Sequence, residues 1–188
     1  MKHPQQTTEA PKSKHAVRRG FLGRFRRNAE GATAIEFGLV ALPFITLLVS
    51  IFETALIFFT QAALDSGVAN AGRMVRTGQV QVQGLSEDQF KTMVCNSLAG
   101  YLDCNNRLTV DVRSFTSFAS VVLPPALDGD GNLNGGTQFS PGASSDVVIV
   151  RAFYVWDLMM PGALTGMSNM SSSKRLLAAA SAFRNEPF

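Results

Sequence analysis

The chain has 188 residues and a formal net charge of +3, a length that fits one domain with appended segments. Residues 1–31 hold eight basic and two acidic side chains, whereas residues 32–188 hold nine basic and twelve acidic ones. The basic character therefore belongs to the first segment alone, which has no nucleic-acid recognition motif. Because Lys and Arg next to a membrane span are retained in the cytoplasm, we expect this segment to flank a membrane and not to bind nucleic acid.

Residues 1–31 are predicted to be a polar, basic leader without a packed core. Prolines and scattered Gln, Thr and Ser residues are typical of a disordered segment. Both histidines of the chain, His3 and His15, fall here. The rest of the chain therefore holds no histidine for a metal site or for a His-dependent catalytic triad.

An apolar run follows the leader. Residues 37–52 contain no charged side chain, and the apolar character resumes after Glu53 up to residue 64. About 20 apolar residues span a bilayer, so this run is long enough for one membrane-spanning helix. A buried core helix would need more chain around it, and a secretory signal peptide has an apolar region of only about 7–15 residues. We therefore predict a single span, with the N-terminus in the cytoplasm and the C-terminus outside.

The predicted helix covers residues 32–77 and therefore extends well beyond the membrane. In its second half, apolar residues recur on one face at spacings of three and four, and polar ones lie elsewhere. The apolar set is Leu64, Val68, Ala71 and Val75, and the polar set is Asp65, Asn70, Arg73 and Arg76. Gly78 is predicted to cap the helix, and Pro43 is predicted to bend it or to release a backbone carbonyl. The second half is thus expected to pack on a folded domain.

Residues 78–188 are predicted to form a small α+β domain with a short helix and an antiparallel sheet of about three strands. Ser86 and Gln89 form a capping-box pattern, which opens a helix running to about Gly100. Residues 108–115 alternate, with Leu108, Val110 and Val112 on one face and Thr109, Asp111 and Arg113 on the other. Residues 146–156 are apolar on both faces, as in a central strand. Residues 174–184 fit a helix or a strand, because their alanines favour a helix.

A carboxylate stands at the start of the apolar run. Gly31 is followed by Ala32, three further uncharged residues, and then Glu36 and Phe37. A charged side chain at the edge of the hydrocarbon is costly and is usually functional. The alternative is a simple helix cap, since the helix dipole favours a carboxylate near the N-terminus.

This pattern resembles the prepilin-peptidase site of type IV pilins, which combines a basic leader, a glycine and a glutamate five residues later. The span with Pro43 and Glu53, followed by QAALDSGVANAGRMVRTG, resembles the TadE-like family of pseudopilins from tight-adherence (Tad/Flp) pilus systems. The terminal AFRNEPF also resembles the end of those proteins. The resemblance favours a strand for residues 174–184.

The resemblance implies a minor pilin or pseudopilin that acts in the assembly of a Tad-type pilus or secretion apparatus, and not an enzyme. A prepilin peptidase would cut after Gly31 and expose the amine of Ala32. Glu36 would then pair with the amine of an adjacent subunit, and Phe37 and Glu53 would share the subunit-packing surface. The implied partners are the bacterial inner membrane, the peptidase, other pilin subunits and Tad inner-membrane components, with residues 78–188 in the periplasm.

Two other functions stay open. The protein could be an uncleaved single-pass membrane scaffold of the same apparatus. It could also be a membrane-anchored enzyme, although residues 32–188 offer no set of nucleophile, base and orienting group. Glu53 has two interpretations as well: it marks the outer membrane interface, or it pairs with a cation such as Arg73 or Arg76 on a staggered neighbour.

Two further features bear on chemistry. Cys95 and Cys104 follow the span, so they face an oxidising compartment and are expected to form a disulfide, with free thiols as the alternative.

The segment 127–136 has alternating Asp and Asn residues, as calcium-binding loops do. As an EF-hand loop beginning at Asp128 it fails, because its sixth residue is Leu133 and its twelfth is Phe139. We expect a turn there, with no metal and no cofactor.

Overall fold

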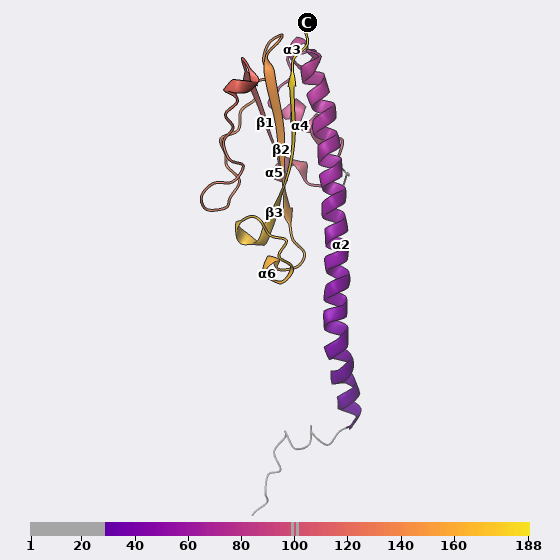
Figure 1. Cartoon of the computed structure of the whole chain (residues 1–188). Coiled ribbons are helices and arrows are strands. Elements are labelled where there is room, and N and C mark those ends of the chain that lie inside the picture. Colours follow the sequence, from indigo (N-terminus) through magenta and orange to yellow (C-terminus); the bar gives the residue numbers. More distant parts are fainter. Residues whose placement is uncertain (1–28, 99, 101) are drawn as a thin grey trace, which may run out of the picture. The chain divides into compact units, whose positions relative to one another are not determined.

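The computed structural model describes residues 29–98, 100 and 102–188. The chain divides into two units, residues 1–45 and residues 46–188. Most of the predicted leader, residues 1–28, lies outside the described residues, so the expectations about it stay predictions. The helices and strands follow in the order α2 (Ala29–Arg76), α3 (Gln79–Val82), α4 (Glu87–Cys95), α5 (Cys104–Arg107), β1 (Leu108–Phe115), η1 (Phe118–Ser120), β2 (Val147–Asp157), α6 (Gly162–Thr165), η2 (Ser171–Ser173) and β3 (Lys174–Arg184), as Figure 1 shows.

The long predicted helix is present as α2, which starts three residues before the predicted residue 32 and ends one residue before the predicted residue 77. Pro43 lies inside α2 and does not end it. Gly78 follows the helix with a φ of 75°, a left-handed conformation that glycine adopts without strain. Its N–H donates to the Val75 carbonyl at 3.0 Å, so the predicted C-cap is confirmed.

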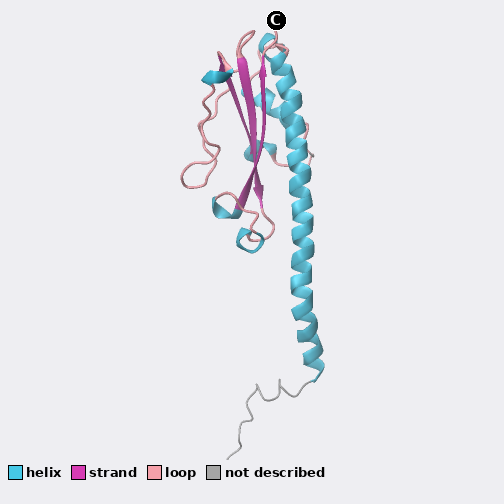
Figure 2. Cartoon of the chain, viewed as in Figure 1, coloured by secondary structure: helices cyan, strands magenta, loops and turns pink. Residues whose placement is uncertain are grey.

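The three predicted strands form one antiparallel sheet in the order β1-β2-β3, shown in Figure 2. β1 and β3 have the predicted bounds, and β2 is shifted by one residue from the prediction. In the register, Val110 lies opposite Ala152, which lies opposite Ala179. The strand prediction for residues 174–184 is therefore correct, and the α+β class is confirmed.

One face of the sheet packs against α2 and α4 to form the core. The predicted apolar stripe of α2 is buried, with exposures of at most 2%. It joins a cluster with side chains from all three strands and from α4, which includes Leu64, Val68, Ala71, Val75, Phe90, Val94, Val110, Val112, Val148, Val150, Ala152, Tyr154, Leu177 and Ala179. At about 25 cal/mol per Å² of apolar surface, such burial is the main source of stability in a domain of this size.

Two glycines let α2 approach its neighbours closely. A Cβ built on Gly72 would lie 3.0 Å from a ring carbon of Phe183 on β3. A Cβ built on Gly67 would lie 3.0 Å from the Val94 carbonyl of α4 and 3.0 Å from the Cβ of Ser97. Any larger side chain at either position would force α2 away from β3 or from α4.

The short helix α4 begins as predicted and ends early. The N–H of Gln89 donates to Ser86 Oγ at 3.3 Å, and the N–H of Ser86 donates to Gln89 Oε1 at 2.9 Å, which confirms the capping box. α4 ends at Cys95 and not near Gly100. Cys95 is bonded to Cys104, the first residue of α5, so the predicted disulfide is present.

The long connection between β1 and β2 contacts the second face of the sheet at β1 and β2, whereas Ala178, Ala180 and Ala182 of β3 are exposed on this face. Asp111 lies on the predicted polar face of β1, yet it is buried, with an exposure of 1%. Its carboxylate accepts hydrogen bonds from Arg151 Nη2 at 2.6 Å, from Arg113 Nε at 2.9 Å and from the backbone N–H of Gln138 at 2.9 Å. Arg151 Nη1 also donates to the Pro124 carbonyl at 2.9 Å. These bonds hold the connection on the sheet, so this face is not solvated at Asp111.

Side chains cover part of the outer edge of β3. The amide of Asn169 makes both backbone bonds of Leu176: Oδ1 accepts from the Leu176 N–H at 2.6 Å, and Nδ2 donates to the Leu176 carbonyl at 3.2 Å. Gln61 of α2 donates from Nε2 to the Ala178 carbonyl at 2.9 Å. The Leu176 N–H and the carbonyls of Leu176 and Ala178 on the outer edge of β3 are thus satisfied within the chain.

Candidate subunit-packing surface

The predicted cleavage position is open but helical. Gly31 lies inside α2. Its neighbours include three alanines, at positions 29, 32 and 34, and alanine is the strongest helix former. A Cβ built on Gly31 would meet no atom within 4 Å. Among the described residues, space for a side chain is therefore open at Gly31.

Glu36 and Phe37 both face outward from α2. Glu36 is exposed and has no hydrogen-bond or ion-pair partner among the residues that the structure describes. The Phe37 side chain is 74% exposed. The two residues thus place an exposed aromatic ring and an exposed carboxylate next to each other at the start of α2.

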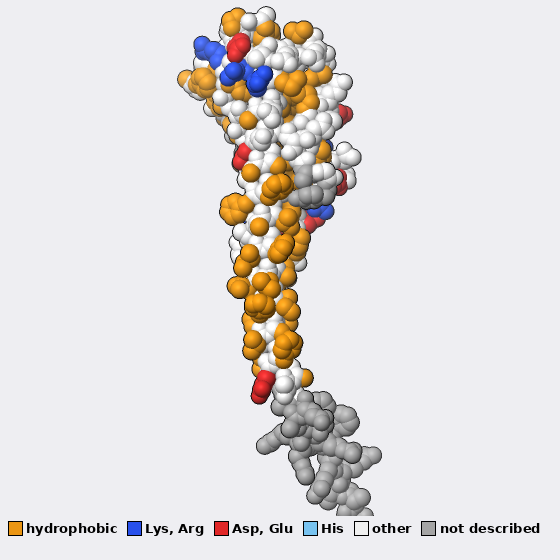
Figure 3. Space-filling view, turned by 90° about the vertical axis from the view of Figure 1, so that its right-hand side faces the viewer, with side chains coloured by type: hydrophobic (Ala, Val, Ile, Leu, Met, Phe, Trp, Pro, Cys, Tyr) orange, Lys and Arg blue, Asp and Glu red, His pale blue; other side chains and the backbone are white. Residues whose placement is uncertain are grey.

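Large apolar side chains continue along α2 beyond Phe37. Most of those between residues 35 and 52 are more than half exposed, and they lie on all sides of the helix. We call this set the apolar surface of α2; it consists of Ile35, Phe37, Leu39, Val40, Leu42, Phe44, Ile45, Leu47, Leu48, Ile51 and Phe52. Figure 3 shows hydrophobic side chains along the visible face of the helix. α2 is long and apolar enough to cross a membrane, which is consistent with a single-pass membrane protein.

Glu53 is buried between α2 and the connection that follows β2. It is fully buried, and its Oε1 accepts a hydrogen bond from the backbone N–H of Met159, in the connection between β2 and β3. Among the described residues, its Oε2 has no hydrogen-bond partner. Within its own chain Glu53 therefore bonds to the connection between β2 and β3, and its roles at the outer membrane interface or against a neighbour's cation stay predictions.

A pattern in the sequence could have revealed the position of Glu53. The buried stripe of α2 continues backwards from Leu64 through Thr60 and Ile57 to Glu53, at the same spacings of three and four. Glu53 is the first residue of that stripe among the buried residues of α2. Its partner could not be inferred, because Met159 is 106 residues away in the chain.

The two arginines proposed as partners for Glu53 are exposed at the end of α2. Arg76 Nε lies 3.2 Å from Glu186 Oε1, and both side chains are about half exposed. An exposed pair of this kind contributes about 0–1 kcal/mol. The structure thus pairs Arg76 within its own chain, and it does not bring Arg73 or Arg76 to Glu53.

The acidic segment 127–136 forms a turn. Asp128 Oδ1 accepts hydrogen bonds from the N–H of Asp130 at 3.0 Å and from the N–H of Asn132 at 2.8 Å. This is the local bonding by which Asp stabilises turns. Within the described part of the chain, no group of three or more His, Cys, Asp or Glu side chains could hold a metal ion.

Most of α2 matches a known protein family. Residues 31–73 match the family of TadE-like proteins. The resemblance found in the sequence is thus confirmed for this segment. No curated protein and no solved structure matches the chain. The TadE-like segment begins at Gly31 and contains Ala32, Glu36, Phe37 and Glu53, whereas the whole sheet lies outside it.

Proposed function

We propose that this protein is a minor pilin or pseudopilin that acts in the assembly of a Tad-type pilus or secretion apparatus, with a structural and not a catalytic role. The match of residues 31–73 to TadE-like proteins supports this function. The observation that carries it is the exposed carboxylate of Glu36, which has no partner among the described residues. It lies five residues after Gly31 on a helix with exposed apolar side chains.

In this proposal a prepilin peptidase cuts after Gly31. The cut removes the basic leader and leaves a free amine on Ala32, the first residue of the mature helix. The apolar surface of α2 then packs laterally against helices of other subunits, where an unpaired charge is costly. Glu36 meets the amine of a neighbouring subunit there, because a buried charge is tolerated when it is paired.

The proposed location follows from the basic charge of the leader and the apolar span after it. The basic leader stays on the cytoplasmic side, α2 crosses the bacterial inner membrane, and the domain built on the sheet lies in the periplasm. The disulfide between Cys95 and Cys104 supports this orientation, because disulfides persist in oxidising compartments. The partners are the peptidase, other pilin subunits and inner-membrane components of the apparatus.

The first experiment is N-terminal sequencing and mass spectrometry of the protein made together with its peptidase. The mature chain should begin at Ala32, and Gly31→Leu should prevent cleavage. Gly38→Leu is the matched control, because Gly38 lies in the same helix and a Cβ on it would also meet no atom within 4 Å. A protein that still begins at Met1 would favour the uncleaved membrane scaffold instead.

A further inference from the structure

The connection between β2 and β3 is unusual for an exposed part of a domain. Residues 158–173 contain no Asp, Glu, Lys, Arg or His, and residues 158–167, which we call the apolar loop, read LMMPGALTGM. Within the apolar loop, Met159 is 61% exposed and Leu164 is 71% exposed. Large apolar side chains that face outward together indicate a surface that meets a partner or a membrane.

The apolar loop is attached firmly to α2. Glu53 accepts the hydrogen bond from the N–H of Met159, and Thr54 Oγ1 lies 3.5 Å from the sulfur of Met167. Arg175 Nη1 donates to the Met167 carbonyl at 2.8 Å, which fixes the other end of the loop to β3. Figure 1 shows α6, which lies within the loop, at the end of the sheet beside α2. The loop therefore holds a fixed position against α2 at Glu53 and Thr54.

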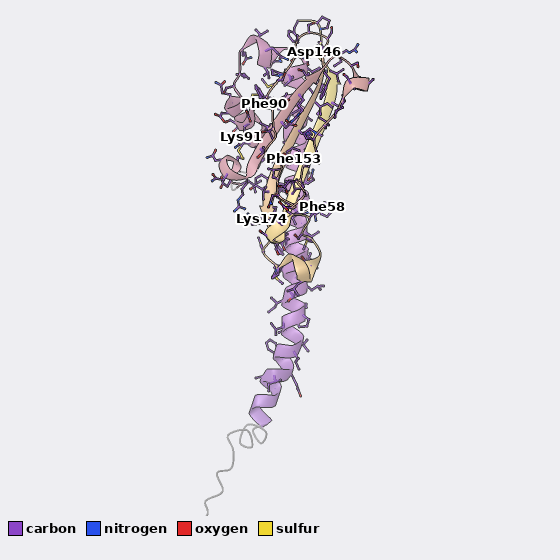
Figure 4. The ribbon with its side chains drawn as sticks, turned by 90° about the vertical axis from the view of Figure 1, so that its left-hand side faces the viewer. Phe58, Phe90, Lys91, Asp146, Phe153 and Lys174 are labelled. Carbon is purple, nitrogen blue, oxygen red and sulfur yellow. A yellow bond between two sulfur atoms is a disulfide. The ribbon has the colours of Figure 1, made fainter. Side chains whose placement is uncertain are left out.

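Charged side chains begin where the connection ends. Asp157 and Lys174 are paired across β2 and β3, and their charged atoms lie 3.6 Å apart. Arg107 Nη2 lies 2.6 Å from Asp157 as well. These three side chains are partly exposed and separate the uncharged connection from the rest of the sheet. In Figure 4, Phe58 of α2 and Lys174 lie at this same end of the sheet.

The position of the loop along the span can be counted in residues. A span of about 20 residues that begins at Phe37, the first residue of the uncharged run, ends at Leu56. The two residues that hold the apolar loop, Glu53 and Thr54, lie within the last turn of that span. On α2 next to them, Phe52 and Phe58 are each at least 70% exposed. The loop thus stands beside the part of α2 that would lie in the outer edge of the bilayer.

We propose that the apolar loop inserts into the outer leaflet of the membrane beside α2, with Met159 and Leu164 among the acyl chains and Arg107, Asp157 and Lys174 at the lipid headgroups. This proposal rests on the membrane anchoring in the proposed function. Cationic side chains reach headgroups while apolar neighbours enter the hydrocarbon, as in proteins that lie in the membrane interface. The buried carboxylate of Glu53 then acts as a positioning residue that holds the loop at this depth.

The test places an environment-sensitive dye at single positions of the full chain in phosphatidylcholine vesicles. Three variants are labelled: Leu164→Cys in the apolar loop, Leu47→Cys in the span, and Val122→Cys, an equally exposed apolar position far from the loop in sequence. The native cysteines are in a disulfide and stay unlabelled. Nitroxide-bearing lipids then report contact with the acyl chains, and aqueous iodide reports contact with water.

We expect the dye at Leu164 to behave as at Leu47, with a blue-shifted emission, quenching by the nitroxide lipids and loss of quenching by iodide. The dye at Val122 should be quenched by iodide alone. If iodide quenches the dye at position 164 while the nitroxide lipids quench the dye at position 47, the proposed insertion of the loop is overturned. The membrane span of α2 is still supported in that case. If neither quencher affects the dye at position 164, protein covers the apolar loop, and this outcome also overturns the proposed insertion. Failure of lipid quenching at Leu47 would contradict the membrane anchor and the proposed function.

Discussion

The two parts of α2 use their apolar residues differently. Between residues 31 and 52 the apolar side chains lie on all sides of the helix and are mostly exposed. From Glu53 onwards one stripe is buried against the sheet and α4. Phe58 and Phe59 are still exposed, and beyond them Asp65, Asn70 and Arg73 face outward. A helix that is apolar all round requires lipid or other helices as its surroundings, whereas a striped helix packs on its own domain.

This difference shows how one helix can serve two purposes. The stripe fixes the domain to the helix through intramolecular packing, so its residues contribute to folding. No residue of the first part is among the described residues of that core, and in the proposed function this part meets the membrane and other subunits. Substitutions in the first part should therefore affect assembly, and substitutions in the second part should affect stability.

The largest effect is expected from Glu36→Gln. If Glu36 pairs with the amine of a neighbouring subunit, its loss leaves a buried charge unpaired, at a cost of about 3–5 kcal/mol. Because each 1.4 kcal/mol is tenfold in an equilibrium constant, recovery of the protein in sheared pili should fall by about two decades or more. Cleavage after Gly31 should persist, as measured by the mass of the membrane-bound protein.

A helix cap at Glu36 would give a different result. Its loss would cost about 1 kcal/mol or less and leave assembly nearly unchanged. Normal recovery of a cleaved Glu36→Gln protein in pili would show that the intersubunit role is wrong.

The second prediction compares two leucines of the same helix. Leu64 is fully buried and Leu47 is 58% exposed. Leu64→Ala should lower the free energy of unfolding by about 2–5 kcal/mol, because it opens a cavity in the core. Leu47→Ala should change it by about 0.5 kcal/mol or less in detergent, since it lies outside the core. The fluorescence of Trp156, which is buried next to the core, reports unfolding in denaturant.

Equal effects at the two leucines would contradict the division of α2. A large loss at Leu47 alone would mean that the first part of the helix also belongs to the core. Assembly offers a second measurement: Leu47→Ala should weaken recovery in pili more than its small effect on stability explains.

The third prediction concerns the support that α4 gives to the stripe. The disulfide closes a loop with a sequence separation of nine residues between α4 and α5. Its removal by the double substitution Cys95→Ser and Cys104→Ser should cost about 2–3 kcal/mol by chain-entropy estimates. Thermal unfolding of the native and substituted proteins measures this loss. Alkylation of the unreduced native protein should label neither cysteine, and labelling of both would contradict the disulfide.

The smallest effect is expected at the start of α4. Ser86→Ala removes the side-chain acceptor for the Gln89 N–H and should cost about 1 kcal/mol. Ser66→Ala is the control, because Ser66 is exposed inside α2 and caps no helix. The free energies of unfolding of the two variants, measured in denaturant, should differ by most of this cost. Equal midpoints would show that the capping box contributes little to the packing of α4.

The sequence predicted those elements whose signals are local. The strands at 108–115 and 146–156 follow from alternating and continuous apolar patterns, and the stripe of α2 follows from its helical spacing. The capping box could be predicted because Ser86 and Gln89 are three residues apart in the sequence. The third strand needed the resemblance to TadE-like proteins, since its alanines fit a helix equally well.

The features that were missed depend on contacts between distant residues. Asp111 is buried because the connection between β1 and β2 folds over it and supplies the Gln138 N–H, and that connection has no periodic pattern. Glu53 is buried because a backbone group of the apolar loop reaches it. The roles of Gly31, Glu36 and Phe37 were predicted from the family pattern, and their exposure in the structure supports those roles without testing them.

The amides of Asn169 and Gln61 also affect how this protein can associate with others. By bonding to Leu176 and Ala178, they occupy edge positions at which a strand of another chain would pair. Exposed strand edges are common starting points for aggregation and for sheet extension between molecules. An incoming strand would have to displace both amides here. Pairing with a strand of another chain is therefore disfavoured at these two positions of β3.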